Sequence, residues 1–166
     1  MKFIIVSEQS KNLIYGMEEL RNKLAGESNR EVFCLQYNRG EHRDIIGEIK
    51  ALHPDLLITT DLAGFEQCTL TDNISYNLLD CKQLHLMFHG KLLNEPYLAR
   101  QLSIAMFFYC AGDACYDGLI CKYPNIPYLK KISGWQESIE PQAQARNAEI
   151  LYAAVEEVLQ ECGIQP

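Results

Sequence analysis

The sequence predicts an α/β fold, in which helices cover both faces of a parallel sheet to form a three-layer α/β/α sandwich. Two observations lead to this prediction. Short apolar segments of strand length alternate along the chain with segments whose apolar residues recur at helical spacing. In addition, the run from Leu56 to Ile58, bounded by Pro54 and Gly64, is short and apolar, as expected of a strand that is covered on both faces.

The first half of the chain supplies three predicted strands and two predicted helices. The strands are expected at residues 2–7, 31–37 and 55–61. The first helix carries Leu13, Met17, Leu20 and Leu24 on one face, and the second carries Ile45, Ile49 and Leu52. Ser10 is the expected N-cap of the first helix, and Gly26 is its expected end.

The second half continues the alternation. Strands are expected at residues 83–88, 104–110 and 128–132, the last of them at an edge of the sheet. Helices are expected from about Thr71–Asp72 and at residues 95–102, 114–123 and 141–162. The last helix has the clearest pattern, because Leu151, Ala154, Val155, Val158 and Leu159 share one face, while Glu149, Glu156, Glu157 and Glu161 face outward. Gly163 ends this helix.

Joined by right-handed crossovers, these elements form a Rossmann-like, doubly wound parallel sheet of five to six strands in one domain, residues 1–166. The net charge is −7 and the pI is about 5.1, which argues against a nucleic-acid surface, because such a surface needs basic residues to neutralise phosphates. No segment approaches the ~18 apolar residues of a membrane span, and no secretion signal is visible, so a cytoplasmic location is expected.

Polar residues follow several predicted strands, and the carboxyl ends of parallel strands are where ligands bind in open α/β sheets. The segment after the third strand is rich in hydroxyl and amide groups. The candidate ligand-binding residues are Ser7, Glu8, Asp61, Gly64, Ser75, Tyr76, Asn77, His89 and Asp113. The alternative for Asp61 is a turn cap, since an aspartate after a strand often bonds the following turn. Beside amides and hydroxyls, a carboxylate also suits a sugar or a nucleoside.

Several familiar sites are absent from the sequence. The first strand–helix turn, SEQSKN, has no glycine, so neither the GxGxxG dinucleotide cradle nor the phosphate-binding loop is present, and the turn is a poor flavin phosphate site. His85 and His89 would lie roughly 13 Å apart along a strand and cannot hold one ion. His85 is expected in the core. The cysteines lack the CxxC spacing of zinc sites, and neither a metal nor a cofactor is expected.

Two other functions stay open. A small hydrolase or transferase could use Asp61 or Cys110 with His89 as base, although Cys110 is better explained as a buried structural cysteine. An interaction protein or homodimer with a vestigial site is the other possibility. It would use the aromatic residues of the last third of the chain, which could equally pack under the last helix; they are Tyr97, Tyr116, Tyr123, Tyr128 and Trp135. The predicted edge strand at 128–132 could also pair with a strand of another molecule, unless Lys130 and Lys131 protect that edge.

The pattern HPDLLITTDLAGFE…SYNLLDCKQLHLMFHGK resembles the amino-terminal half of glycosyltransferases of the GT-B fold. In that family a third strand with this pattern is followed by a loop, a helix and a strand that ends in His-Gly. The resemblance covers about residues 1–135. It implies an acceptor-binding domain whose ligand is a sugar or nucleotide-like molecule, with Asp61, Gly64, His89 and residues 75–77 in the matching loops. It also implies that a second domain, not visible in these 166 residues, would hold the donor.

Overall fold

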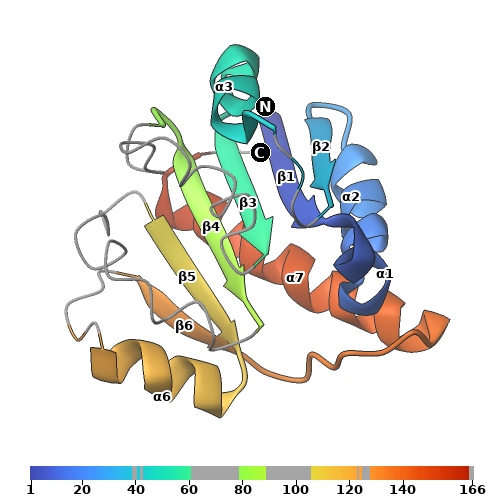
Figure 1. The fold of residues 1–166 in the computed structure, drawn as a ribbon, viewed down its shortest axis with the longest axis vertical. Helices are drawn as coiled ribbons and strands as arrows, with labels where there is room; N and C mark the ends of the chain where they lie inside the picture. Colours follow the sequence, from blue (N-terminus) through green and yellow to red (C-terminus); the bar gives the residue numbers. More distant parts are fainter. Residues whose placement is uncertain are drawn as a thin grey trace.

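A computed structural model of the chain describes residues 1–38, 41, 43–60, 79–88, 106–122, 124 and 128–164. Within these ranges the chain forms a six-stranded, all-parallel sheet (Figure 1). Its strands are β1 (Lys2–Glu8), β2 (Glu31–Tyr37), β3 (Leu56–Thr60), β4 (Lys82–Met87), β5 (Met106–Ala111) and β6 (Leu129–Ile132). The order across the sheet is β2-β1-β3-β4-β5-β6.

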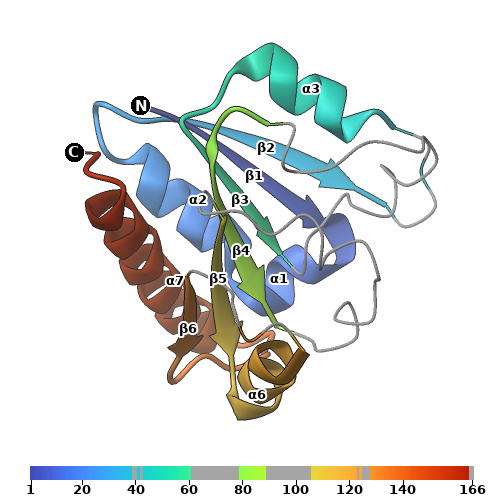
Figure 2. The ribbon, with the colours of Figure 1, turned by 90° about the vertical axis from the view of Figure 1, so that its left-hand side faces the viewer.

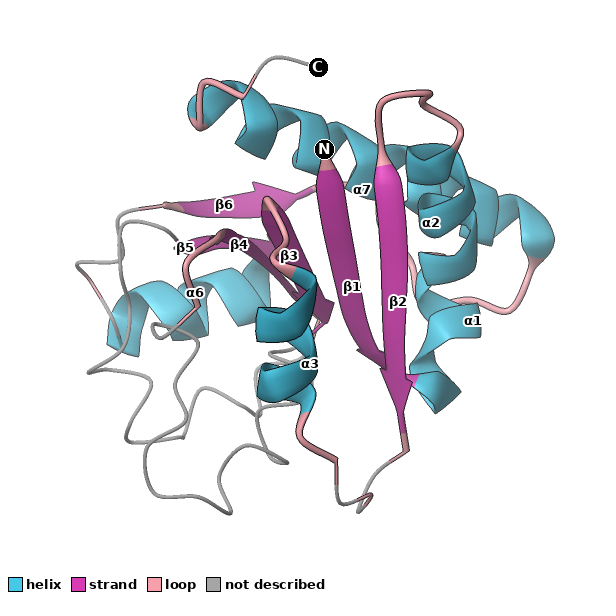
Figure 3. Ribbon diagram, turned by 90° about the horizontal axis from the view of Figure 1, so that it is seen from above, coloured by secondary structure: helices cyan, strands magenta, loops and turns pink. Residues whose placement is uncertain are grey.

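Helices lie on both faces of this sheet, as Figures 1 and 2 show from two sides. They are the 3-10 helix η1 (Gln9–Lys11) and the α-helices α1 (Asn12–Tyr15), α2 (Met17–Ala25), α3 (Ile45–Leu52), α6 (Asp113–Lys122) and α7 (Pro141–Glu161). Seen from above, α1, α2 and α7 cover one face, called here the α7 face, and α3 and α6 cover the other, the α3 face (Figure 3). The predicted three-layer, Rossmann-like α/β fold is confirmed.

Successive side chains of β1 point alternately to the two faces of the sheet. Phe3 and Ile5 point to the α7 face and pack in one apolar cluster with buried residues of α2 and α7. Ile4 and Val6 point the other way and pack with Ile45 and other residues of α3. Since successive side chains of a strand lie on opposite faces, a strand buried on both sides must be apolar throughout.

The strands form within two residues of their predicted bounds, and β6 lies at the predicted edge of the sheet. The predicted helices 114–123 and 141–162 correspond to α6 and α7. At the end of α7, the N–H groups of Gly163 and Ile164 donate to the carbonyls of Gln160 and Leu159, a Schellman motif with Gly163 at φ +67°. The helices expected from Thr71–Asp72 and at 95–102 fall outside the described residues.

The helix predicted over Leu13–Leu24 is wrong in one respect, because it is broken at Gly16. Gly16 has φ +75° and separates α1 from α2. A Cβ on Gly16 would lie 2.7 Å from the carbonyl oxygen of Gln144 in α7, so only glycine allows this close approach. Ser10 is not an N-cap, since it lies within η1 and its hydroxyl donates to Glu8. Gly26 ends α2 as predicted.

No helix in the described part of the chain is long and apolar enough to cross a membrane.

Candidate functional site

The strand order contains a topological switch between β1 and β3. β1 lies between β2 and β3, and the chain leaves β1 through α1 and α2 on the α7 face but leaves β2 through α3 on the α3 face. This strand order, with β1 between β2 and β3, puts the switch point of a doubly wound sheet between β1 and β3. In doubly wound sheets of this order, ligands bind at the switch point.

Four polar residues lie at the ends of the elements around this switch point. Ser7 and Glu8 end β1, Thr60 ends β3, and Asn12 is the first residue of α1. Ser7, Asn12 and Thr60 are only 2%, 7% and 4% exposed. Ser7 and Thr60 each follow the paired residues Val6 and Thr59, so they lie next to each other on neighbouring strands.

The hydrogen bonds of Asn12 and Thr60 leave part of their capacity unused among the described residues. The Ser7 hydroxyl donates to Oδ1 of Asn12 at 2.5 Å, and the Ser10 hydroxyl donates to Oε1 of the half-buried Glu8 at 2.9 Å. Neither Nδ2 of Asn12 nor the hydroxyl of Thr60 has a hydrogen-bond partner among the described residues. The two residues are nearly buried, but these two atoms are not among the fully enclosed polar atoms without a partner, so both are open to a ligand or to water.

Of the predicted residues, Ser7 lies beside Asn12 and Thr60, which were not predicted, and Glu8 follows Ser7 at the end of β1. An asparagine that follows the first strand by four residues, and a second threonine at the end of an apolar strand, were the available signals. Asp113 lies elsewhere. It begins α6 after β5, is separated from β3 by β4, and its 78% exposed side chain pairs with Lys131 at 2.6 Å.

The other predicted ligand-binding residues fall outside the described residues and stay predictions. They are Asp61, Gly64, Ser75, Tyr76, Asn77 and His89. Asp61 is the next residue in the sequence after Thr60.

A second polar group lies on the α3 face and is fully enclosed. The Thr59 hydroxyl lies 2.7 Å from Nδ1 of His85, and Nε2 of His85 lies 3.1 Å from Oε1 of Gln83. All three residues are at most 1% exposed. Burial lowers the pKa of His85 to about 3, so its ring is neutral at pH 7. His85 is a core histidine, as predicted.

Cys110 is buried as well. It is 0% exposed and lies in the apolar cluster of the α3 face with Phe108 and Leu119. This is the position of a structural cysteine, closed to a substrate.

An aromatic group lies beside the carboxyl edge of the sheet on the α7 face. Phe88, which follows β4, stacks on Trp135 with ring centroids 4.4 Å apart, and Tyr15 of α1 contacts both rings. Nε1 of Trp135 donates to the Tyr15 carbonyl at 3.5 Å. Trp135 is the only tryptophan of the chain, so its fluorescence reports on this region.

The aromatic residues that were candidates for an interface do not form one surface among the described residues. Tyr116 packs against the α3-face cluster and Trp135 against the α7-face cluster, both partly buried. Tyr128 is 36% exposed and stacks on Phe107. Tyr97 and Tyr123 fall outside the described residues.

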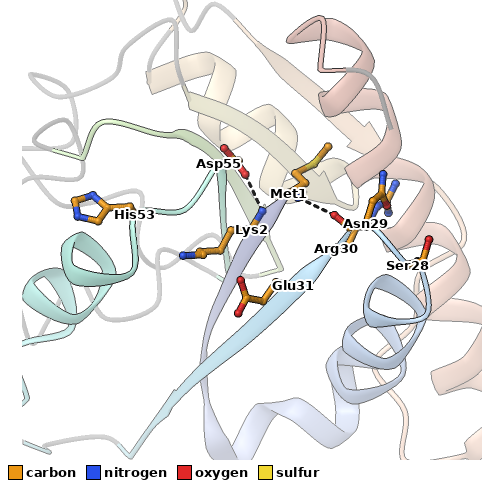
Figure 4. A pocket seen from close by; sticks show the side chains of 8 residues that line it. All are labelled: Met1, Lys2, Ser28, Asn29, Arg30, Glu31, His53 and Asp55. Atoms are coloured by element: carbon orange, nitrogen blue, oxygen red, sulfur yellow. Dashed lines mark hydrogen bonds between the residues drawn. The ribbon is translucent and has the colours of Figure 1, made fainter.

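The opposite, amino edge of the sheet carries an open hollow of about 480 Å³ (Figure 4). It lies around the start of β1 and β2, and its polar groups bond to each other. The backbone N–H of Lys2 donates to Asp55 at 2.7 Å, the nitrogen of Met1 donates to the Asn29 carbonyl at 2.7 Å, and the Lys2 ammonium donates to the Leu52 carbonyl. These bonds hold the start of β1 to the connections that lead into β2 and β3, which is a structural role.

Among the described residues, no three histidine, cysteine or acidic side chains are grouped so that they could hold a metal ion. No family model, curated protein or solved structure matches this chain. Its function therefore has to be argued from the residues themselves.

Proposed function

We propose that this chain is a binding domain that takes a small polar ligand at the carboxyl edge of its sheet, between the ends of β1 and β3. The observation that carries the proposal is a pair of polar groups on nearly buried residues, Nδ2 of Asn12 and the hydroxyl of Thr60, which have no hydrogen-bond partner among the described residues. A ligand with matching hydrogen-bonding groups would satisfy both, and the switch point is where ligands bind in doubly wound sheets.

Binding is favoured over catalysis because the possible nucleophiles, Thr59 and Cys110, are fully buried. Thr59, with its hydroxyl against His85, has the hydrogen bond that a nucleophile and its base require, but both residues are 0% exposed. Cys110 is 0% exposed among apolar side chains. A substrate could reach neither group without a rearrangement of the core.

The resemblance to the acceptor-binding half of GT-B glycosyltransferases supplies the ligands to test first. It suggests a sugar or a nucleotide-like molecule, and a role as a glycosyltransferase-like module that works with a separate donor-binding partner. The hydroxyl, amide and carboxylate groups of Thr60, Asn12 and Glu8 are chemically suited to such ligands, because they form directional hydrogen bonds with hydroxyl groups.

Two-dimensional ¹H–¹⁵N NMR titration of the ¹⁵N-labelled protein tests the proposal. Monosaccharides, nucleosides and nucleotides are added in turn. We expect at least one compound to shift the backbone amide signals of Glu8, Asn12 and Thr60 in a saturable way, while Lys2 and Glu31, at the opposite ends of β1 and β2, stay unchanged. Shifts confined to the amino edge, or no saturable shift with any compound, would overturn the proposal.

A further inference from the structure

We infer that two copies of this chain pair through the outer edge of β2, with the two strands antiparallel about a two-fold axis at Cys34. This pairing would join the two six-stranded sheets into one continuous sheet. The inference does not depend on the ligand proposed above.

The two edge strands of the sheet, β2 and β6, differ in how they are protected from pairing (Figure 1). β6 is four residues long, and two of these are Lys130 and Lys131. A short length and lysine side chains are common devices that keep an edge strand from pairing with another chain. β2 is seven residues long, with the sequence EVFCLQY, and contains neither lysine nor proline. β2 is therefore the edge that lacks this protection.

Three residues of β2 direct their backbone N–H and C=O groups away from β1, and they are Val32, Cys34 and Gln36. The N–H of Glu31 donates to the Met1 carbonyl at 2.9 Å, so the backbone groups of Glu31 face β1. Since successive residues of a strand direct these groups to opposite sides, the next residue and every second one after it face outward. In agreement with this, Nη1 of Arg43 donates to the Gln36 carbonyl at 2.8 Å from outside the sheet. No described residue bonds the outward groups of Val32 and Cys34.

These outward groups are self-complementary about Cys34. In an antiparallel pair centred there, Cys34 lies opposite its counterpart, and Val32 lies opposite Gln36 of the second copy. The outward N–H and C=O groups of all three residues then meet partners. The Gln36 carbonyl can accept from the second copy as well as from Arg43, because its oxygen has two lone pairs. A contact of this kind uses the same surface on both copies and closes at two chains.

The side chains along this edge favour a second copy as the partner. Val32, Phe33 and Cys34 are only partly buried in the single chain, and pairing would cover them further. The exposed Glu31 begins the strand, and Arg43 lies beside its other end. Antiparallel pairing brings Glu31 of each copy to the end where Arg43 of the other copy lies. Opposite charges therefore meet at both ends of the interface by symmetry alone.

The first experiment measures the mass of the unmodified chain by sedimentation equilibrium. We expect twice the 19.0 kDa of one chain at micromolar concentrations. Gln36→Pro removes an N–H that makes no bond within the sheet, and it should weaken dimerisation by at least about tenfold. Gln36→Ala keeps this N–H and should remain dimeric, and both variants should keep the circular dichroism spectrum of the unmodified chain. A mass of one chain at every concentration, or equal dimerisation of the two variants, would overturn the inference.

The second experiment changes a charge at the proposed interface. Glu31→Lys places a second cation beside Arg43 of the other copy, so it should weaken dimerisation about fivefold. Glu137→Lys makes the same change of charge at an exposed position between β6 and α7, and it should leave dimerisation unchanged. Equal effects of these two variants would contradict the proposed interface.

The third experiment locates the two-fold axis by crosslinking. Opposed residues of a hydrogen-bonded antiparallel pair have Cα atoms about 5.5 Å apart, so a short bismaleimide should join the two Cys34 side chains. Cys34→Ser should abolish the covalent dimer. Cys121→Ser, which removes an exposed cysteine of α6, should retain it. A covalent dimer that depends on Cys121 and not on Cys34 would overturn the inference.

Discussion

The hydroxyl of Thr59 on β3 lies 2.7 Å from Nδ1 of His85 on β4, in the middle of a sheet whose other residues are largely apolar. On the far side of the same ring, Nε2 faces Oε1 of Gln83 at 3.1 Å. Because that oxygen can only accept, Nε2 carries the proton and Nδ1 accepts from Thr59. The three side chains thus bond to one another around a neutral imidazole, and this arrangement makes the stability of the fold sensitive to acid.

The free energy of unfolding should fall as the pH drops from 7 to 5. Burial lowers the pKa of His85 from 6.5 to about 3 in the folded chain. Below pH 6.5 the unfolded chain therefore binds a proton that the folded chain does not, and the loss between pH 7 and pH 5 is about 2 kcal/mol. Urea unfolding at the two pH values measures it.

The His85→Gln variant is the control for this prediction. It removes the titrating ring, so its stability should change much less over the same pH range. The pKa values of Glu48 and Glu157 are lowered by hydrogen bonds from Arg43 and Lys130, respectively, so their contributions are lost only as the pH falls below about 4.5. An equal loss in the variant would show that another group is responsible.

Valine substitutions of the two neighbouring threonines should have opposite effects on the stability of the ligand-free chain. Thr59→Val removes the buried hydroxyl that donates to Nδ1 of His85, and the loss of this hydrogen bond should cost about 1–3 kcal/mol. Thr60→Val replaces a hydroxyl without a described partner by a methyl group, so it should be neutral or stabilising by up to about 1 kcal/mol. Urea unfolding compares both with the unmodified chain. A comparable loss in the two variants would show that Thr60 has a structural bond.

The sequence was sufficient to predict the layers and the strands, because these depend on local patterns. The alternation of apolar residues along β1 and the spacing of Leu151, Val155 and Val158 in α7 already determine which faces are buried. Ser7 and Glu8 could be selected because the carboxyl end of a strand is a known place for ligands.

Features that depend on contacts between distant segments could not be predicted in this way. The break at Gly16 exists because α7 approaches the end of α1. Glu156 was expected to face outward, yet it is half-buried and pairs at 2.6 Å with Arg30, whose side chain is 2% exposed. Asn12 and Thr60 stand out only because Nδ2 of the one and the hydroxyl of the other have no partner among the described residues, and a sequence does not show which polar groups remain unsatisfied.

Asn147 should prove important for the segment that joins β6 to α7. It is 1% exposed, its Nδ2 donates to the Gln136 carbonyl at 2.5 Å, and its Oδ1 accepts from the Gln136 N–H at 3.0 Å. Asn147→Ala removes both bonds and should cost about 1–2 kcal/mol. Because Trp135 is the neighbouring residue, its emission should also shift to longer wavelength. Gln142→Ala, an exposed position on the same helix, should change neither quantity; equal effects of the two variants would contradict the prediction.

Two glycines with similar backbone angles should differ in their tolerance of alanine. Gly16 has φ +75° and Gly163 has φ +67°, so a Cβ adds a comparable strain of about 1 kcal/mol at either position. At Gly163 nothing lies within 4 Å of that Cβ, whereas at Gly16 it would lie 2.7 Å from the Gln144 carbonyl oxygen and 3.1 Å from Cβ of Asn147. Gly163→Ala should therefore cost about 1 kcal/mol.

Gly16→Ala should cost roughly 3 kcal/mol, because α7 must move away from α1 in addition to the backbone strain. The movement would displace Asn147 and, through its bonds to Gln136, the segment that carries Trp135. We therefore expect Gly16→Ala to shift the tryptophan emission in the same direction as Asn147→Ala, and Gly163→Ala to leave it unchanged. Urea unfolding and fluorescence of the three variants measure both quantities. Equal losses of stability in the two glycine variants would mean that the contact between α1 and α7 relaxes without cost.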